Sequence, residues 1–294
     1  MLQIRGHVPV HITDAHLEEY VVAVSNRLSY RTLKTYLCGI KVVLLLSGHD
    51  TKQLFQKRLH YFLRGVRRAQ GLRFRRPRRI PITISHLRHL LSSTRALLSP
   101  ADARCFTAAF LLAFFGLLRV SEFTTPSITS FDTTTHLCPA DVSFSPTFHM
   151  AYIRIKASKT DSFREGCTIR LAATGIPDMC PVQALRDYIS GVRGFRGPFF
   201  ALSNGQCLTR HHINSVLRRV FPWALPGTIA SHSFRIGGAS MLCSLGVPDA
   251  TIQIMGRWSS DAFRQYLHIS DNRIARLQRS MACGTSLPFQ TWLP

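Results

Sequence analysis

A run of arginines in the first third of the chain constrains the fold more than any other feature. Between positions 64 and 79 there are eight arginines and no acidic residue. Pro77 and Pro81 prevent a continuous helix through the end of this run, because proline lacks the amide N–H that a helix interior needs. The run therefore marks a boundary between two units. We predict a first unit over residues 1–70, a linker over 71–82 and a second unit over 83–294.

The overall charge indicates a polyanionic partner. The chain has 294 residues, with 37 Lys and Arg against 15 Asp and Glu, which gives a formal net charge of +22. Because 46% of the residues are hydrophobic, the chain can bury a sizeable core and is not a disordered basic tail. Self-repulsion at this charge favours a nucleic acid as the partner, with an anionic membrane surface as the alternative.

The sequence weakens the membrane alternative. Its most apolar segment, residues 108–118, is well short of the roughly 20 residues needed to cross a bilayer. Met1 is followed by a mixed polar segment without the apolar core of a secretion signal. The eight cysteines form no CxxC pair, which is typical of reduced thiols inside a cell. We therefore expect no membrane partner, no secretion, and no metal or other cofactor.

Hydrophobic spacing predicts a mostly α fold with a small β-hairpin or sheet. In the first unit, apolar residues recur at helical spacing after Thr13, Ser29 and Asp50. In the second unit, residues 151–155 and 167–171 alternate apolar with polar side chains, as strands of a hairpin do. Helices are predicted from Thr83, Pro100, Pro181 and Thr209, and across residues 231–268.

Four short segments of the second unit contain residue types suited to chemistry. In GLLRVSE, Glu122 follows Arg119 by three positions and can orient its guanidinium. SKTD places Lys159 at the hairpin tip, and HSFR places His232 and Arg235 on one helix face ahead of small residues at 237–240. The fourth segment is GRWSSDAFRQY, which contains Trp258 and Tyr266. Each residue taken alone has an ordinary structural explanation, as a helix cap, a surface lysine or a packing side chain.

Taken together, these segments resemble the tyrosine recombinase, or phage integrase, family. GLLRVSE is similar to the family's first arginine box, SKTD to its hairpin lysine segment, and HSFR to its second box. The form of GRWSSDAFRQY is most similar to recombinases of eukaryotic mobile elements, of the DIRS, Ngaro and Crypton types. Trp258 precedes Tyr266 by eight positions, one fewer than is usual in phage integrases, and Tyr266 is the only tyrosine after Tyr188.

The resemblance implies a helical core-binding domain, a linker and a catalytic domain that cuts and rejoins DNA without metal or ATP. Phosphoryl transfer needs positive charge at the non-bridging oxygens of the phosphate. The resemblance assigns this role to Arg119 and Arg235, whose guanidinium groups are planar and permanently charged. It also implies that the indole N–H of Trp258 donates to a phosphate oxygen.

For bond breakage, the resemblance implies three further roles. Tyr266 attacks the scissile phosphate and gives a 3′-phosphotyrosyl bond and a free 5′-hydroxyl. His232 helps to remove the phenol proton, because a phenol of pKa roughly 10 is a weak nucleophile at neutral pH. Lys159 protonates the departing 5′ oxygen.

The resemblance also implies a homo-tetramer working on two DNA duplexes, located in the nucleus if the host is eukaryotic and otherwise in the cytoplasm or nucleoid. We expect the segment after Asp271 to dock into a neighbouring protomer. Cationic side chains of the first unit and the linker are expected to bind DNA phosphates. These are Arg31, Lys34, Lys41, Arg67, Arg68, Arg73, Arg75, Arg76, Arg78 and Arg79.

Other functions remain open at this point. A DNA-binding protein of the same fold that no longer reacts, whether inactive or domesticated, fits the same motifs. A metal-dependent transposase or nuclease needs grouped carboxylates, which 15 acidic residues without clustering do not favour. A structural basic protein would not need HSFR and GRWSSDAFRQY at these spacings. The segment 124–150 is longer than in compact bacterial relatives and has no assigned role.

Overall fold

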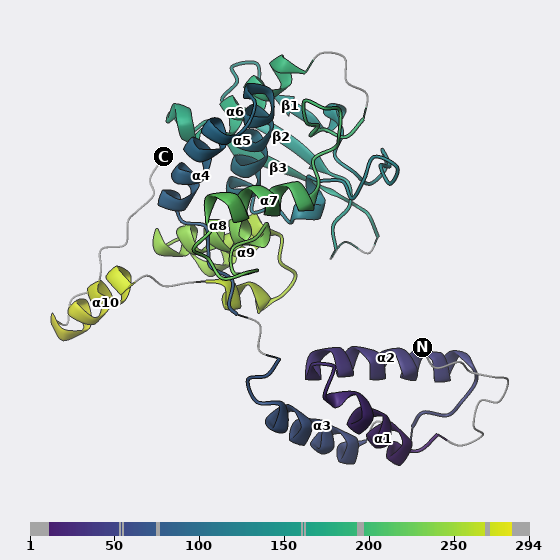
Figure 1. The fold of residues 1–294 in the computed structure, drawn as a ribbon. Helices are drawn as coiled ribbons and strands as arrows, with labels where there is room; N and C mark the ends of the chain where they lie inside the picture. Colours follow the sequence, from purple (N-terminus) through teal and green to yellow (C-terminus); the bar gives the residue numbers. More distant parts are fainter. Residues whose placement is uncertain are drawn as a thin grey trace. The chain divides into compact units, whose positions relative to one another are not determined.

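Two separately packed units make up the chain, Met1–Pro77 and Arg78–Pro294. Figure 1 shows the computed structural model of the chain. The boundary between the two units lies inside the predicted linker. The structure describes residues 12–52, 54, 56–74, 77–159, 161, 163–192, 197–267 and 271–283. Each unit is described separately below.

The first unit contains α1 (Asp14–Ser25), α2 (Tyr30–Leu46) and α3 (Lys57–Gln70). One apolar face of each helix supplies its core, which is formed by Leu17, Val21, Leu33, Leu37, Leu59 and Leu63. Gln70 joins the end of α3 to the turn between α1 and α2. Its side chain accepts from the Tyr30 amide at 2.8 Å and donates to the Ser25 and Leu28 carbonyl oxygens at 2.9 Å. The first unit is thus a small helical domain, with the predicted helices present.

The helical part of the second unit surrounds α5 (Pro100–Phe115), which is the apolar helix of the sequence analysis. Every residue from Ala108 to Phe114 is at most 3% exposed, and α4, α6 and α8 pack against it. Pro100 begins α5 at a position where proline's missing N–H costs nothing. The other helices are α4 (Ile84–Leu97), α6 (Pro181–Gly191), α7 (Arg210–Val220), α8 (His232–Ser244), α9 (Asp249–Gly256) and α10 (Asp271–Cys283). No described helix is long and apolar enough to cross a membrane.

The sheet of the second unit is antiparallel with strand order β1-β2-β3. It consists of β1 (Val142–Phe144), β2 (Met150–Ile155) and β3 (Cys167–Ala172). The predicted hairpin is β2 and β3, with Ile153 opposite Ile169. The strand β1 and the short 3-10 helix η2 (Pro139–Asp141) lie in the segment 124–150 that had no assigned role. Mostly helical structure with a small antiparallel sheet confirms the predicted fold class.

Close backbone contacts position α8, and they depend on two glycines. A Cβ on Gly237 would lie 2.0 Å from the carbonyl oxygen of Ile82, and one on Gly238 would lie 2.5 Å from the carbonyl oxygen of Phe114. Residues 80–82 run alongside the chain that leads into α8, with Ile80 N donating to Thr228 O at 2.8 Å and Ile82 N to Ser233 O at 3.0 Å. These residues, predicted as linker, are therefore hydrogen-bonded parts of the second unit.

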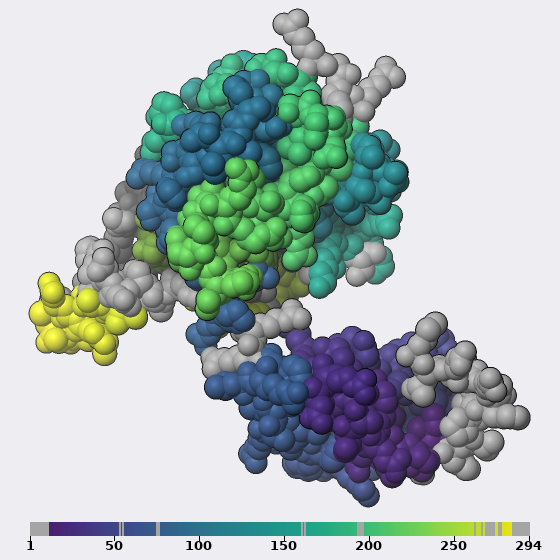
Figure 2. All heavy atoms as spheres, in the orientation of Figure 1, coloured from purple at the N-terminus to yellow at the C-terminus, as the bar shows by residue number. Residues whose placement is uncertain are grey.

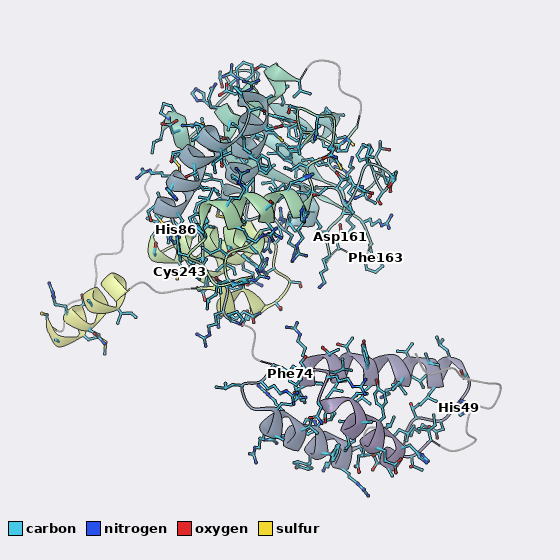
Figure 3. All side chains as sticks on the ribbon, in the orientation of Figure 1. His49, Phe74, His86, Asp161, Phe163 and Cys243 are labelled. Atoms are coloured by element: carbon cyan, nitrogen blue, oxygen red, sulfur yellow. The ribbon has the colours of Figure 1, made fainter. Side chains whose placement is uncertain are left out.

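One surface of the second unit is shared by α4 and α7, which lie side by side (Figure 2). His86 of α4 contacts the rings of Phe221 and Trp223 beyond the end of α7, with ring centroids 5.6 and 6.0 Å apart. His86 is labelled among the side chains of Figure 3, which also labels Asp161 and Phe163 in the β2–β3 turn. In that view, Asp161 and Phe163 lie on the side of the second unit opposite His86.

Candidate active site

Arg119 leaves the end of α5 through a turn in which Leu117 has a left-handed backbone, with φ of 49°. The short helix η1 (Val120–Glu122) follows and brings Glu122 back onto Arg119. The Arg119 amide and its Nη1 donate to the two carboxylate oxygens of Glu122, at 2.9 and 3.0 Å. The Glu122 side chain is 0% exposed and that of Arg119 is 17% exposed. Glu122 therefore contacts the guanidinium that the i,i+3 spacing predicts it to orient.

A second arginine, Arg257, contacts the same carboxylate from 135 residues further along the chain. Its Nη2 donates to Glu122 Oε2 at 2.7 Å, and its side chain is 19% exposed. Arg257 follows the last residue of α9 and has a left-handed backbone, with φ of 56° and ψ of 46°. The sequence analysis did not include it. The one signal in the sequence was the spacing to the tyrosine. Arg257, rather than Trp258, lies nine positions before Tyr266, which is the usual spacing in phage integrases.

Arg235 connects the two turns that carry these arginines. Its Nη1 donates to the Leu117 carbonyl oxygen, and its Nη2 donates to the Gly256 carbonyl oxygen at 2.6 Å. The residue is 1% exposed and lies in the first turn of α8. These two bonds use two of the five N–H donors of a guanidinium. Arg235, predicted to contact a phosphate, is thus placed inside the protein beneath the Arg119 and Arg257 turns.

Trp258, predicted to donate to a phosphate, packs between α8, α9 and the 3-10 helix η4 (Asp261–Tyr266). Its ring lies 4.1 Å from the Arg235 Cζ, measured to the ring centroid, and 5.4 Å from the Phe263 ring. Gly256 makes room for it, since a Cβ there would lie 1.6 Å from the indole. The indole therefore stabilises the Arg235 guanidinium through a cation–π contact.

His232 is the first residue of α8 and is surrounded by arginine charge. Burial, followed by the charges of Arg235, Arg79, Arg119 and Arg210, lowers the pKa of His232 to about 4. At neutral pH the imidazole is therefore uncharged and able to accept a proton.

Two of these arginines, Arg79 and Arg210, were not predicted near the site. Arg79 was predicted as a DNA contact in the linker, and the structure places it where its charge acts on His232. Arg210 was missed altogether. The only hint is its position at the first residue of α7, where the helix dipole disfavours a cation.

The hairpin turn that carries Lys159 lies beside the Arg257 segment. Asp161 shapes this turn, accepting from the Glu165 and Gly166 amides at 3.1 and 2.9 Å. Lys159 is exposed. A pocket of about 340 Å³ is lined by residues of the hairpin on one side and by the segment after α9 on the other. Its lining includes Ile155, Ser158, Asp161, Glu165, Gly166, Cys167, Arg257, Trp258 and Ser259.

Two groups of predicted site residues lie outside the described structure. Tyr266 is the last residue of η4, and its side chain is outside the described part. Arg75 and Arg76 are outside it entirely. The remaining predicted DNA contacts of the first unit lie on or just after two helices: Arg31, Lys34 and Lys41 on α2, Arg67 and Arg68 on α3, and Arg73 after it. Apart from half-buried Lys41, these side chains are exposed. Arg78 is exposed at the start of the second unit.

Metal ligands are not grouped in the described residues: no three or more His, Cys, Asp or Glu side chains lie where they could hold a metal ion.

Comparison with known proteins identifies the fold. No protein-family model and no curated protein matches the sequence. Among solved structures, the Tn1549 transposon integrase bound to circular intermediate DNA matches with a TM-score of 0.58 and 16% identity, over 93% of this chain and 87% of that chain. The XerH recombinase on its difH substrate matches with a TM-score of 0.61 and 17% identity, over 92% and 73%. A lambda integrase dimer on a core site matches at 0.53 and 14%, over 87% and 65%. The chain has the tyrosine recombinase fold.

Proposed function

We propose that the protein is a site-specific DNA recombinase or integrase of a mobile element, which cuts and rejoins DNA through a 3′-phosphotyrosyl intermediate. The observation that carries the proposal is the group of arginines whose charges act on His232, in a tyrosine recombinase fold. A group of cations around an uncharged imidazole suits an anionic substrate that must lose and gain protons. The solved structures with this fold include complexes with DNA, which supports DNA as the substrate.

In the proposed reaction, the Tyr266 oxygen attacks the scissile phosphorus. A bond forms between that oxygen and phosphorus, and the bond from phosphorus to the 5′ oxygen breaks. His232 accepts the phenol proton in this scheme, and its imidazole starts uncharged, as a general base must. The Lys159 ammonium gives a proton to the 5′ oxygen. Rejoining reverses these steps, so the reaction needs no ATP.

The arginines stabilise the charge of the phosphate in this scheme. Arg119 is partly exposed and fixed in orientation by Glu122, so it can contact a non-bridging oxygen with little reorganisation. Arg235 contributes positive charge from its buried position. Trp258 supports Arg235 through its ring, and its indole N–H is the proposed donor to the phosphate.

The finer parts of the proposal concern assembly and origin. We infer a homo-tetramer on two duplexes, because exchanging strands between duplexes requires four cuts. The segment after Asp271, which includes α10, is proposed to dock into a neighbouring protomer. The form of GRWSSDAFRQY supports a eukaryotic mobile element, and hence a nuclear location. Truncation before Asp271 should then abolish synapsis of two duplexes while leaving weak binding to one; unchanged synapsis would contradict the docking.

A covalent trap tests the proposed reaction. The full chain is incubated, with EDTA present, with a library of duplexes that are nicked beside a randomised core, so that the cut fragment diffuses away and rejoining fails. We expect SDS-stable protein–DNA adducts with wild type and none with Tyr266→Phe. Sequencing the captured DNA then gives the preferred site. Absence of adduct from wild type across the library would refute the proposal.

One observation favours the alternative of an inactive DNA-binding protein. Both terminal nitrogens of Arg235 donate to backbone carbonyl oxygens, as they would in a purely structural arginine. Tight duplex binding by wild type without adduct formation on any duplex would establish this alternative.

A further inference from the structure

We propose that Arg257 is a further catalytic residue, which binds a non-bridging oxygen of the scissile phosphate together with Arg119. This inference rests on the proposed function and adds a residue to it. Three independent features of Arg257 carry it: its backbone conformation, its hydrogen bonds and its position.

The backbone of Arg257 is in a conformation that favours glycine. Arg257 caps α9 with φ of 56°, and its amide donates to the Gln253 and Ile254 carbonyl oxygens. Helices commonly end in this way with glycine or asparagine, because a Cβ is unfavourable there. The Arg235 bond to the Gly256 carbonyl oxygen and the Trp258 amide bond to the Gln253 carbonyl oxygen, at 3.1 Å, keep the turn in place. An unfavourable backbone conformation that is held in place by its surroundings points to a functional role.

The hydrogen bonds of Arg257 leave one donor nitrogen for a ligand. Nη2 is bonded to Glu122, whereas Nη1 is buried and has no hydrogen-bond partner within the part of the chain that the structure describes. A buried donor without an acceptor is costly, and a phosphate oxygen would satisfy it. Glu122 carries one negative charge between two guanidinium groups, so the group of three has a net positive charge. An anion is therefore the ligand that complements it.

The position of Arg257 places it beside the hairpin turn. Arg257 lines the same 340 Å³ pocket as Ser158, the residue next to Lys159. Two acidic residues, Asp161 and Glu165, also line this pocket. The Asp161 carboxylate accepts hydrogen bonds from two backbone amides, and Glu165 is exposed. The favourable place for an anion is thus on the arginine side. A phosphate there would have the proposed general acid, Lys159, on a neighbouring segment.

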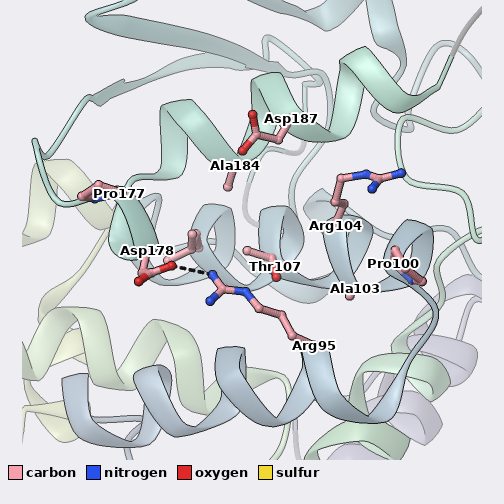
Figure 4. A pocket seen from close by; sticks show the side chains of 10 residues that line it. Arg95, Pro100, Ala103, Arg104, Thr107, Pro177, Asp178, Ala184 and Asp187 are labelled. Carbon is pink, nitrogen blue, oxygen red and sulfur yellow. Dashed lines mark hydrogen bonds and ion pairs between the residues drawn. The ribbon is translucent and has the colours of Figure 1, made fainter.

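A DNA duplex with an uncharged linkage at the scissile position distinguishes a phosphate-binding role of Arg257 from a structural one. The duplex selected by wild type is made with either the ordinary phosphate or a methylphosphonate at the scissile position. A methylphosphonate lacks one negative oxygen and so needs less positive charge for reaction. Wild type, Arg257→Ala and Arg257→Lys are compared by the rate of adduct formation. Arg95→Ala is the matched control, because Arg95 also pairs with a carboxylate, Asp178 at 2.9 Å, in a different pocket that Figure 4 shows.

On ordinary phosphate we expect Arg257→Ala to slow adduct formation by about 100- to 1,000-fold, the usual effect of removing one such donor. Arg257→Lys should fall between Arg257→Ala and wild type, because it keeps the charge and loses the planar fork. Arg95→Ala should stay close to wild type. On methylphosphonate, the deficit of Arg257→Ala should shrink at least ten-fold.

Two results would overturn the proposal: adduct formation by Arg257→Ala at the wild-type rate, or an equal deficit on both substrates, which a structural role would give. Thermal unfolding shows whether Arg257→Ala is folded. If it is not, Arg257→Lys takes its place: a deficit relative to wild type that is smaller on methylphosphonate than on phosphate supports the proposal, and an equal deficit overturns it. A wild-type protein that forms no adduct at all would instead refute the proposed function.

Discussion

Two groups of cationic side chains in this molecule differ in how firmly they are held. Those of the first unit, such as Arg31 on α2 and Arg67 on α3, are exposed. In the second unit, by contrast, Arg119, Arg235 and Arg257 are buried or half-buried, and each is bonded to a carboxylate or carbonyl oxygen. Exposed cations can bind phosphates with an affinity that does not depend on the nucleic-acid sequence, whereas cations held in a fixed position can stabilise a charge that develops during a reaction. Under the proposed function, we therefore assign two different purposes to the net charge of +22.

The strongest challenge to this comparison is the removal of the charge on Glu122. Glu122→Gln leaves Arg119 and Arg257 without a counter-charge while keeping the size of the side chain. We expect a loss of about 3–5 kcal/mol in the free energy of unfolding, as for other broken buried ion pairs. Chemical denaturation of the full chain measures it.

The control for that variant is Asp178→Asn. It breaks a surface pair in which Arg95 is 49% exposed and Asp178 is 76% exposed. A loss below about 1 kcal/mol is expected there. Equal losses in the two variants would show that Glu122 does not differ from an ordinary surface partner.

The second prediction concerns acid and His232. Its pKa is lowered from 6.5 to about 4 in the folded protein, first by burial and then by neighbouring arginines. The unfolded chain thus binds a proton at a higher pH than the folded chain does. The contribution of His232 to stability is full above about pH 6.5 and is lost as the pH falls toward 4.

Thermal unfolding between pH 7.5 and pH 4.5 tests this sign. His232→Asn should lose less stability across the interval than wild type, because the asparagine takes up no proton. His89→Asn, which changes an exposed histidine of α4, should follow the wild-type curve. A steeper loss in His232→Asn than in wild type would contradict the proposed burial of a neutral imidazole.

The parts of the site that the sequence predicts are the local ones. The contact between Arg119 and Glu122 follows from three positions of spacing, and the hairpin follows from alternation along two short segments. The contact between Glu122 and Arg257 spans 135 residues. The helix α8, whose Arg235 bonds to both the Leu117 and the Gly256 carbonyl oxygens, approaches Phe114 and Ile82 through two glycines. No local pattern contains that approach.

Charge alone was also an incomplete guide. Arg79 belongs to the run that predicts a linker, yet residues 80 and 82 are hydrogen-bonded to the chain around α8, which places Arg79 near His232. Arg210 begins a helix and stands outside every recognised segment. Such residues acquire their role from long-range packing, which spacing and composition do not encode.

The smallest expected effect belongs to the first unit and completes the comparison. Arg67 lies on α3, exposed, with its guanidinium 5.5 Å from the centroid of the Tyr30 ring of α2. Arg67→Gln should weaken duplex binding about equally for all sequences and reduce the slope of log affinity against log salt by about one phosphate contact. Adduct formation at saturating DNA should be unchanged, since the fixed arginines of the second unit are intact. Binding titrations between 50 and 200 mM salt, together with the covalent trap, measure both quantities. A rate of adduct formation that falls with Arg67→Gln at saturation would show that the exposed and the fixed cations are not separate groups.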